Sequence, residues 1–221
     1  MATRVEVKPE LFLWALGRAR LEPEALLASL PRLPEWLSGE SQPTYKQLER
    51  FAARTHTPLG FFFLPSPPVE EVPIADFRTL RGKALRSPSA DLLDTIYLCQ
   101  ERQDWYRDFS RAAGERPLAF VNSLTTDTNA TEAALRMTRH LAFDLEARKA
   151  CSSWAEAQRK LIANCEDAGI LVMMSGIVGN NTSRILDTDE FRGFCLVDDR
   201  APVVFVNGVR QQVSPDVHAD A

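Results

Sequence analysis

The chain has 221 residues, of which 45% are hydrophobic and 25% charged. Its formal net charge of −4 argues against a broad nucleic-acid-binding face, although a small local patch of cations is compatible with it. Its four cysteines form no Cys-x-x-Cys pair, which argues against a disulfide framework or a zinc knuckle. No stretch approaches the roughly 18 apolar residues of a membrane span, and the N-terminus lacks the apolar run of a signal peptide, so we expect a cytoplasmic protein without membrane association.

Residues 1–64 have the pattern of several short helices. Pro9 suits the first turn of one helix, and Pro23–Leu30 predicts a second. Thr44 is followed three residues later by Gln47, which is the capping-box pattern at the start of a further helix. Short helices joined by tight turns favour an all-α bundle of the helix-turn-helix type.

A proline-rich linker, residues 65–74, is expected to separate this bundle from a second domain, residues 75–221. The second domain begins with helical patterns, because apolar residues return at three- and four-residue steps in Ser89–Ala113, Thr131–Phe143 and Ser152–Ala168. The predicted inner face of the third helix consists of Trp154, Ala157, Leu161, Ile162 and Cys165.

The last third of the chain has the pattern of a small sheet. Ile170–Met174 predicts a buried strand, and residues 175–181 predict a loop. Phe191–Val197 and Ala201–Asn207 are rich in Val and Phe and are separated by a polar tripeptide, which predicts a β-hairpin. Helices followed by a small sheet indicate an α+β fold.

A two-stranded hairpin needs a helix or another layer to cover its apolar face. The residues after Asn207 do not have the pattern of such a helix, because segment 208–221 lacks apolar residues at helical spacing and is interrupted by Pro215. We therefore expect the second domain to be incomplete, with residues 208–221 as an anomalous tail.

Patterns that carry catalysis or metal binding are few. The chain has three histidines: His56, His140 and His218. No two of them stand at i and i+4, the spacing that a zinc site on a helix needs, and neither a Gly-x-Ser-x-Gly motif nor a phosphate-binding glycine loop occurs. We interpret the carboxylates of Asp187, Asp189 and Glu190 as a solvated loop. We expect no catalytic residue and no metal ligand in this chain.

The N-terminal pattern Leu26-Leu-Ala28, Trp36-Leu-Ser-Gly39-Glu and Gln42-Pro-Thr44 resembles the helix-turn-helix domain of the phage-repressor (Cro/cI, XRE) class. In that class the third helix enters the major groove of DNA. The resemblance therefore implies DNA-contacting roles for the residues that flank this segment: Arg32, Gln42, Tyr45 and Lys46.

The sequence departs from the repressor class at the same place. Only ten residues separate Ala28 from Gly39, and two of them are Pro31 and Pro34, so the third helix must be short. Met1–Pro65 contains eight Lys or Arg and seven Glu, which is a weak balance for binding phosphates. A repressor-like bundle that serves for packing or for contact with a partner is the alternative.

The second half resembles the ImmA/IrrE family of bacterial zinc metallopeptidases in Ser175–Thr182, Glu190–Phe194 and Ala201–Asn207. Such enzymes often stand behind a repressor-like domain and act on transcriptional repressors in stress or mobile-element regulation. In the family, a helix of the form Gln-Met-Phe-Thr-Leu-x-His-Glu-x-x-His follows the last of these strands, with zinc on the two histidines and Glu as the general base.

This helix is absent from the printed sequence. The resemblance implies a zincin-like second domain and zinc in full-length relatives, but no metal ligand carries over to this chain, which we expect to be proteolytically inactive. The implied partner is a repressor or antitoxin-like protein. The alternative is a DNA-binding transcriptional regulator that acts through the helix-turn-helix.

A shifted reading frame near Gly208–Arg210 is our hypothesis for the tail. Read one base out of frame with suitable codons, Arg210–Ala221 can spell Asp-Ser-Lys-Cys-Arg-Gln-Met-Phe-Thr-Leu-Met followed by the first bases of a His codon, which fits the helix of the family up to its first histidine. We predict that the gene encodes His-Glu-x-x-His in the neighbouring frame just beyond this segment. Sequencing of the gene is the check, and a neighbouring frame without that motif contradicts the hypothesis.

Overall fold

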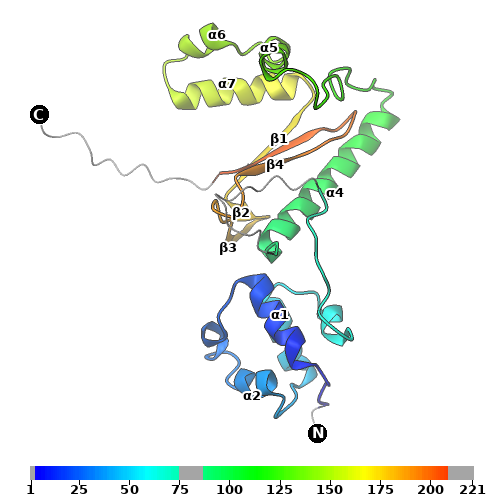
Figure 1. Ribbon diagram of the computed structural model, residues 1–221, viewed down its shortest axis with the longest axis vertical. Helices are drawn as coiled ribbons and strands as arrows, with labels where there is room; N and C mark the ends of the chain where they lie inside the picture. Colours follow the sequence, from blue (N-terminus) through cyan, green and yellow to red (C-terminus); the bar gives the residue numbers. More distant parts are fainter. Residues whose placement is uncertain (1–2, 75–86, 209–221) are drawn as a thin grey trace, which may run out of the picture. The chain divides into compact units, whose positions relative to one another are not determined.

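The computed structural model describes residues 3–74 and 87–208 and shows an α+β protein (Figure 1). The chain divides into two compact units, Met1–Asp94 and Thr95–Ala221, and the division falls inside the helix α4 (Ala90–Ala112). The expected start of the second domain at residue 75, and the anomalous tail from residue 209 onward, lie outside the described residues. No helix in the described parts of the chain combines the length and the apolar character that crossing a bilayer requires.

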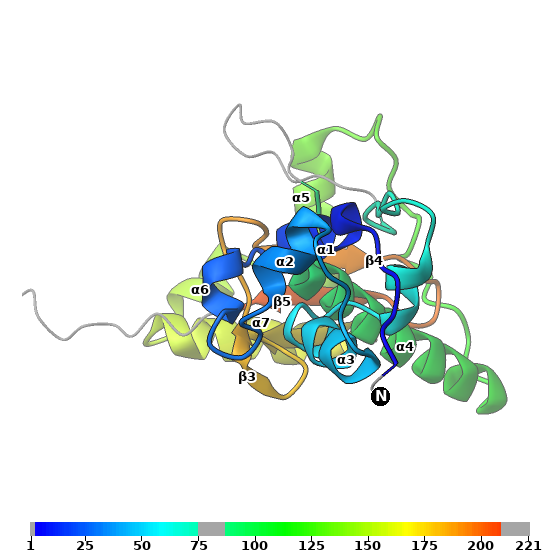
Figure 2. The same ribbon diagram turned by 90° about the horizontal axis from the view of Figure 1, so that it is seen from below.

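The N-terminal unit is a small helical bundle. Its elements are α1 (Pro9–Ala19), the 3-10 helix η1 (Pro23–Leu26), α2 (Leu33–Ser38), α3 (Tyr45–Arg54) and the 3-10 helix η2 (Leu59–Phe63). Figure 2 gives a second view of α1, α2 and α3. Residues 65–74 contain no helix or strand, and Glu70 in this segment accepts a 2.6 Å hydrogen bond from Nε of the buried Arg18 on α1.

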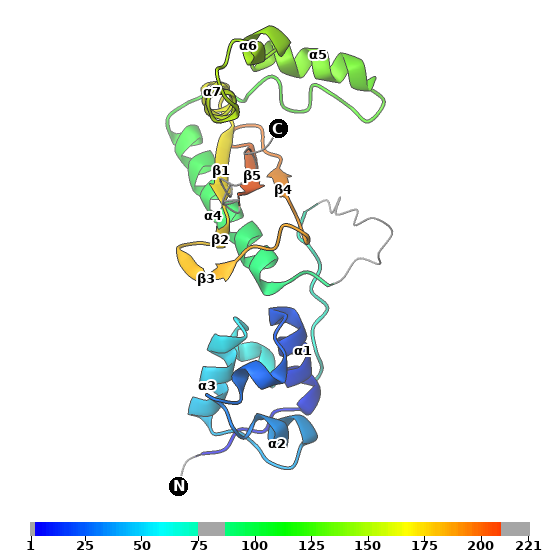
Figure 3. The ribbon, with the colours of Figure 1, turned by 90° about the vertical axis from the view of Figure 1, so that its left-hand side faces the viewer.

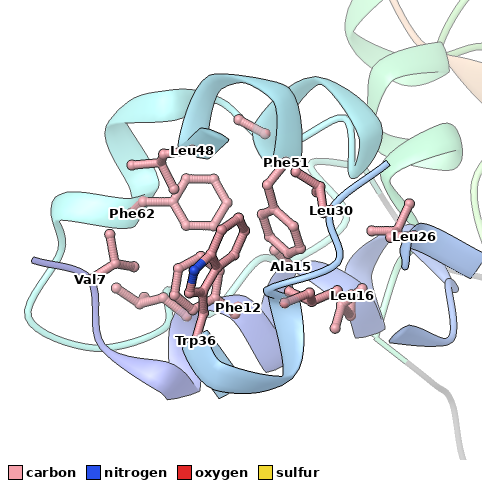
Figure 4. Close-up of a cluster of buried hydrophobic side chains, with 13 residues drawn as sticks. Val7, Phe12, Ala15, Leu16, Leu26, Leu30, Trp36, Leu48, Phe51 and Phe62 are labelled. Atoms are coloured by element: carbon pink, nitrogen blue, oxygen red, sulfur yellow. The ribbon is translucent and has the colours of Figure 1, made fainter. Parts of the chain in front are cut away.

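Four aromatic side chains from four helical segments hold the bundle together (Figure 4). Phe12 of α1 is fully buried, and its ring centroid lies 5.8 Å from Trp36, 5.2 Å from Phe51 and 5.9 Å from Phe62. The Phe12 and Phe51 rings meet edge to face, the arrangement that ring quadrupoles favour. Because Phe12 touches the other three, it is the residue on which the core of this unit depends.

Local signals explain where these helices begin. The predicted capping box is confirmed, since Thr44 Oγ1 accepts from the Gln47 amide at 3.4 Å and Gln47 Oε1 accepts from the Thr44 amide at 2.8 Å. The predicted helix Pro23–Leu30 is wrong in extent, because only η1 forms. Pro31 disfavours the helical conformation for the residue before it, and the chain turns instead.

The second unit starts with four helices and ends in strands. The helices are α4, α5 (Ala130–His140), α6 (Leu145–Lys149) and α7 (Trp154–Asp167). Side chains cap α5 and α7, with Asn129 accepting from the Thr131 amide at 2.9 Å and Ser153 from the Glu156 amide at 3.2 Å. The helix α6, capped by Asp144, was missed by the sequence analysis.

A three-stranded sheet lies at the centre of this unit. Its strands are β1 (Leu171–Ser175), β5 (Val203–Asn207) and β4 (Gly193–Leu196), in that order across the sheet (Figure 3). The pairing of β4 with β5 is antiparallel, so the predicted hairpin is confirmed, and β1 joins β5 in parallel. The predicted loop over 175–181 is wrong, because β2 (Ile177–Val178) pairs with β3 (Asn181–Ile185).

The helix α4 covers one face of the sheet. Along β5, Val203 and Phe205 are buried while Val206 is exposed, which is the period of two that a strand with one covered face shows. The side-chain amide of the buried Gln103 on α4 donates to the carbonyls of Leu196 at 3.1 Å and Ala201 at 2.8 Å. These two hydrogen bonds fasten α4 to the last residue of β4 and to the residue two positions before β5.

Two predictions of burial in this unit are wrong. The strand β1 is only half-buried along most of its length. Trp154, expected on the inner face of the third predicted helix, is 78% exposed. It is the first residue of α7, and the Arg148 guanidinium lies 3.9 Å from the centre of its ring, so a cation and not the core contacts this indole.

Replacement of Phe12 tests the aromatic core. Phe12→Ala is expected to lower the free energy of unfolding by about 3–5 kcal/mol, because it removes a ring that touches three others and leaves a cavity. The neighbouring Leu13→Ala is the control, since Leu13 is 56% exposed, and it is expected to cost about 0.5 kcal/mol or less. Urea denaturation of both variants is the measurement, and equal losses would contradict this account of the core.

Candidate functional site

Arg32, the first expected DNA contact, lies at the N-terminal end of α2 and is bound to Glu35. Its Nε and Nη2 donate to one carboxylate oxygen of Glu35 at 2.9 and 2.5 Å. The hydrogen bond from Arg32 lowers the pKa of the Glu35 carboxyl, and the same bond raises the pKa of Arg32. Both groups stay charged at neutral pH, so the Arg32 charge is offset within its own helix.

Gln42, the second expected DNA contact, forms hydrogen bonds with residues near the N-terminus of the chain. Its Oε1 accepts from the amide of the buried Val7 at 2.9 Å, and its carbonyl oxygen accepts from the Arg4 guanidinium. An isolated bridge between Arg4 and Thr44 continues the same contact. Both oxygens of Gln42 are therefore used as acceptors inside the unit.

Tyr45 and Lys46 are the two expected contacts that face solvent. Tyr45 is 45% exposed and Lys46 is exposed at the N-terminal end of α3. No hydrogen bond or ion pair of the Lys46 side chain occurs among residues 3–74 and 87–208. The structure thus places Gln42, Tyr45 and Lys46 at the start of α3, whereas Arg32 belongs to the start of α2.

A row of cations on α3 was missed by the sequence analysis. Lys46, Arg50 and Arg54 stand at i, i+4 and i+8, so they share one face of the helix, and all three are exposed. Arg50 donates to the Ser29 carbonyl at 3.3 Å, and the exposed Glu49 stands beside the row. The four-residue spacing was available in the sequence as a signal.

The second candidate site is the end of the sheet where the parallel strands β1 and β5 finish. Ser175 and Asn207 are register partners there, and the amide of Gly208 donates to the Ser175 carbonyl at 3.0 Å. Asn207 donates from Nδ2 to the Phe191 carbonyl at 3.0 Å, while its buried Oδ1 has no partner among the described residues. This acceptor alone makes no reaction centre.

The carboxylates before β4 do not form one solvated group. Asp187 and Asp189 are exposed, and Asp187 Oδ1 accepts from the Asp189 amide at 2.8 Å in a tight turn. Glu190 is buried, so its interpretation as part of a solvated loop is wrong. The turn directs Glu190 into the unit while its neighbours remain in solvent.

Within residues 3–74 and 87–208, no cluster of three or more His, Cys, Asp or Glu is suited to hold a metal ion. His56 is a turn residue with φ of 50°, and the ring of His140 packs on Phe120 at 4.4 Å. His218 lies outside the described residues. Zinc therefore does not fit the donor set of this part of the chain.

Burial works against nucleophilic chemistry at three cysteines: Cys99, Cys165 and Cys195. Burial raises the pKa of the Cys99 thiol to about 11. Burial also raises the pKa values of Cys165 and Cys195. A nucleophilic cysteine needs the opposite shift, because the thiolate is the reactive form.

Comparison with known proteins gave no match, whether to a family model, to a curated protein or to a solved structure.

Alanine substitutions distinguish expected DNA contacts that stabilise the fold, such as Gln42, from those that are exposed, such as Tyr45. Gln42→Ala is expected to lower the free energy of unfolding by about 1–3 kcal/mol, because the buried Val7 amide loses its acceptor. Tyr45→Ala is expected to cost about 0.5 kcal/mol or less, since its ring is largely solvated. Chemical denaturation followed by circular dichroism measures both, and a larger loss for Tyr45→Ala would contradict the assignment.

Proposed function

We propose that this chain is a regulatory protein of the ImmA/IrrE type, with a repressor-like helical unit followed by a zincin-like unit, and that it acts by binding another protein and not by hydrolysing peptides. The order of its pieces supports the family assignment, since a helical bundle precedes helices and a mixed sheet.

The exposed apolar surface of the second unit carries this proposal. Large apolar side chains that are exposed in this unit are Tyr97, Trp105, Phe109, Leu135, Met137, Leu145, Trp154, Met174, Ile185, Val197 and Val206. Single exposed apolar residues are ordinary, but exposed aromatic side chains next to one another are typical of surfaces that bind proteins. Trp105 and Phe109 are such a pair on α4.

The resemblance gives the class of partner. Relatives act on repressors, so the proposed partner is a repressor or an antitoxin-like protein. The N-terminal unit in this proposal serves for packing or partner contact, because two of its four expected DNA contacts, Arg32 and Gln42, are bonded within the unit.

The second candidate function is DNA binding through the N-terminal unit. The row formed by Lys46, Arg50 and Arg54 favours it, because three exposed cations on one helix face match the spacing of a phosphate-binding surface. A row of this kind gives affinity without reading sequence, since base contacts and not phosphate contacts specify a site.

A gel-shift titration distinguishes the two functions. The proposal predicts only weak binding to duplex DNA, without sequence preference, and a plot of log K against log salt with a slope no steeper than about −3, as expected for three phosphate contacts. The triple variant Lys46→Ala, Arg50→Ala, Arg54→Ala is expected to abolish this binding.

The matched control replaces three exposed cations of the second unit, Arg111, Arg136 and Lys149, with Ala and should leave DNA binding unchanged. A complex that selects one duplex over unrelated competitors, and that the α3 variant abolishes, would overturn the proposal in favour of a DNA-binding regulator.

A further inference from the structure

An exposed aromatic pair lies on the outward side of α4. Trp105 is 69% exposed and Phe109 is 52% exposed. Their ring centroids are 5.9 Å apart and their planes differ by 10°, so the two rings stack and form one continuous apolar surface. Exposure of two adjacent large rings is costly in water, and a partner that covers them gains the transfer free energy of both.

Three carboxylates lie beside the aromatic pair, along one edge of the exposed face of α4. Glu101, Asp104 and Asp108 succeed one another at three- and four-residue steps, so they form a row on one side of α4 beside the rings. Asp104 and Asp108 are 60% and 74% exposed at the side chain, and Glu101 is exposed as well.

The three cations of α4 compensate the acidic row only in part, and the exposed Arg102 donates to Met173 Sδ at 3.8 Å instead of to a carboxylate. Arg107 binds Asp104 at 2.6 Å but also Asp198 at 3.2 Å, so one guanidinium serves two carboxylates. Arg111 lies 3.7 Å from Asp108, at the limit of an ion pair. Glu101 has no hydrogen bond or ion pair with any residue in the described ranges, which leaves the row with unmet negative charge.

A second exposed tryptophan of the same chain, Trp154, makes a cation–π contact with an arginine. The Arg148 guanidinium lies 3.9 Å from the ring centre of Trp154. Over the described ranges no guanidinium occupies the corresponding position on Trp105 or Phe109. An arginine or lysine from outside can therefore stack on these rings and reach the acidic row at the same time.

We infer that the α4 surface formed by Glu101, Asp104, Trp105, Asp108 and Phe109 is a docking site for a basic amphipathic helix of a protein partner. Apolar side chains of that helix cover the two rings, and Lys or Arg along one edge pairs with the acidic row. This inference rests on the proposed protein-binding function and gives the chemistry of the partner that the second unit recognises.

Other occupants fit this surface less well. The acidic row repels nucleic acid and anionic membrane surfaces. In a two-fold pair of antiparallel α4 helices, the acidic row of one copy faces the acidic row of the other, which disfavours self-association through this surface.

Peptide binding to the full chain tests the inference. The probe is a fluorescein-labelled amphipathic helical peptide with Leu on one face and Arg on the other, and its anisotropy is followed during titration with the protein. The double variant Trp105→Ala, Phe109→Ala is expected to weaken binding about tenfold or more, as the loss of aromatic anchors does. The double variant Glu101→Gln, Asp108→Asn is expected to weaken it less at high salt than at low salt.

Two controls make the outcome decisive. Trp154→Ala removes an equally exposed indole from α7 and should leave the affinity unchanged, and a peptide with Glu in place of Arg should bind at least about tenfold more weakly. The inference is overturned if wild type fails to bind the Arg peptide, if the α4 variants bind it as well as wild type, or if Trp154→Ala weakens binding as much as they do.

Sedimentation of the protein alone tests self-association through this surface. A wild-type dimer that becomes a monomer in the double variant Trp105→Ala, Phe109→Ala would assign the surface to a second copy of the chain and overturn the inference. These outcomes do not decide the proposed function, which the DNA titration tests independently.

Discussion

The side-chain amide of Gln103 connects the helix α4 to both sides of the turn that joins β4 to β5. Its nitrogen donates to the carbonyls of Leu196 and Ala201, and the residue is buried where it does so. This contact fixes the rotation of α4 about its own axis. Since Trp105 follows two residues later, about 200° around the helix, its side chain must point away from the sheet. The same hydrogen bonds therefore hold the fold together and expose the aromatic pair.

The hairpin places a second constraint on this unit. Because β5 pairs with β1 on one side and β4 on the other, both rows of its main-chain groups are satisfied, and one face of the sheet is covered by α4. The ion pair between Arg107 and Asp198 fastens the connection before β5 to the same helix. Asp198 has a lowered pKa despite the opposing effect of burial, since two main-chain amides and Arg107 bond its carboxylate.

Polar residues of the N-terminal unit are used mainly for its own structure. Arg32 pairs with Glu35, Gln42 holds the amide of Val7, and Arg18 donates to Glu70. A helix-turn-helix that reads bases needs side chains with unused donors facing the groove. A row of three exposed cations, Lys46, Arg50 and Arg54, lies instead along α3, where it suits phosphates better than base edges.

Much of the fold could be predicted from the sequence, because its signals are local. The capping box at Thr44 and the two apolar runs of the hairpin each lie within a few residues, and each was confirmed. The pairing of Arg32 with Glu35 is also local, and its three-residue spacing could have shown that this arginine is engaged.

The remaining features depend on contacts between distant residues. Periodicity marked Trp105 and Phe109 as part of a helix, but it could not tell which side of α4 faces the sheet. That choice is made by Gln103 through partners more than ninety residues away. Trp154 was placed in the core for the same reason, and its contact with Arg148 leaves it outside. The register of β1 against β5 likewise has no signal within either strand.

Binding without hydrolysis is the central claim, and zinc is its most direct test. The full chain would be loaded with zinc, dialysed, and analysed for metal content, and then incubated with a helix-turn-helix repressor whose mass is followed over time. The account predicts that zinc is retained well below one ion per chain and that the repressor stays intact. One zinc ion held per chain together with zinc-dependent cleavage of the repressor would contradict it.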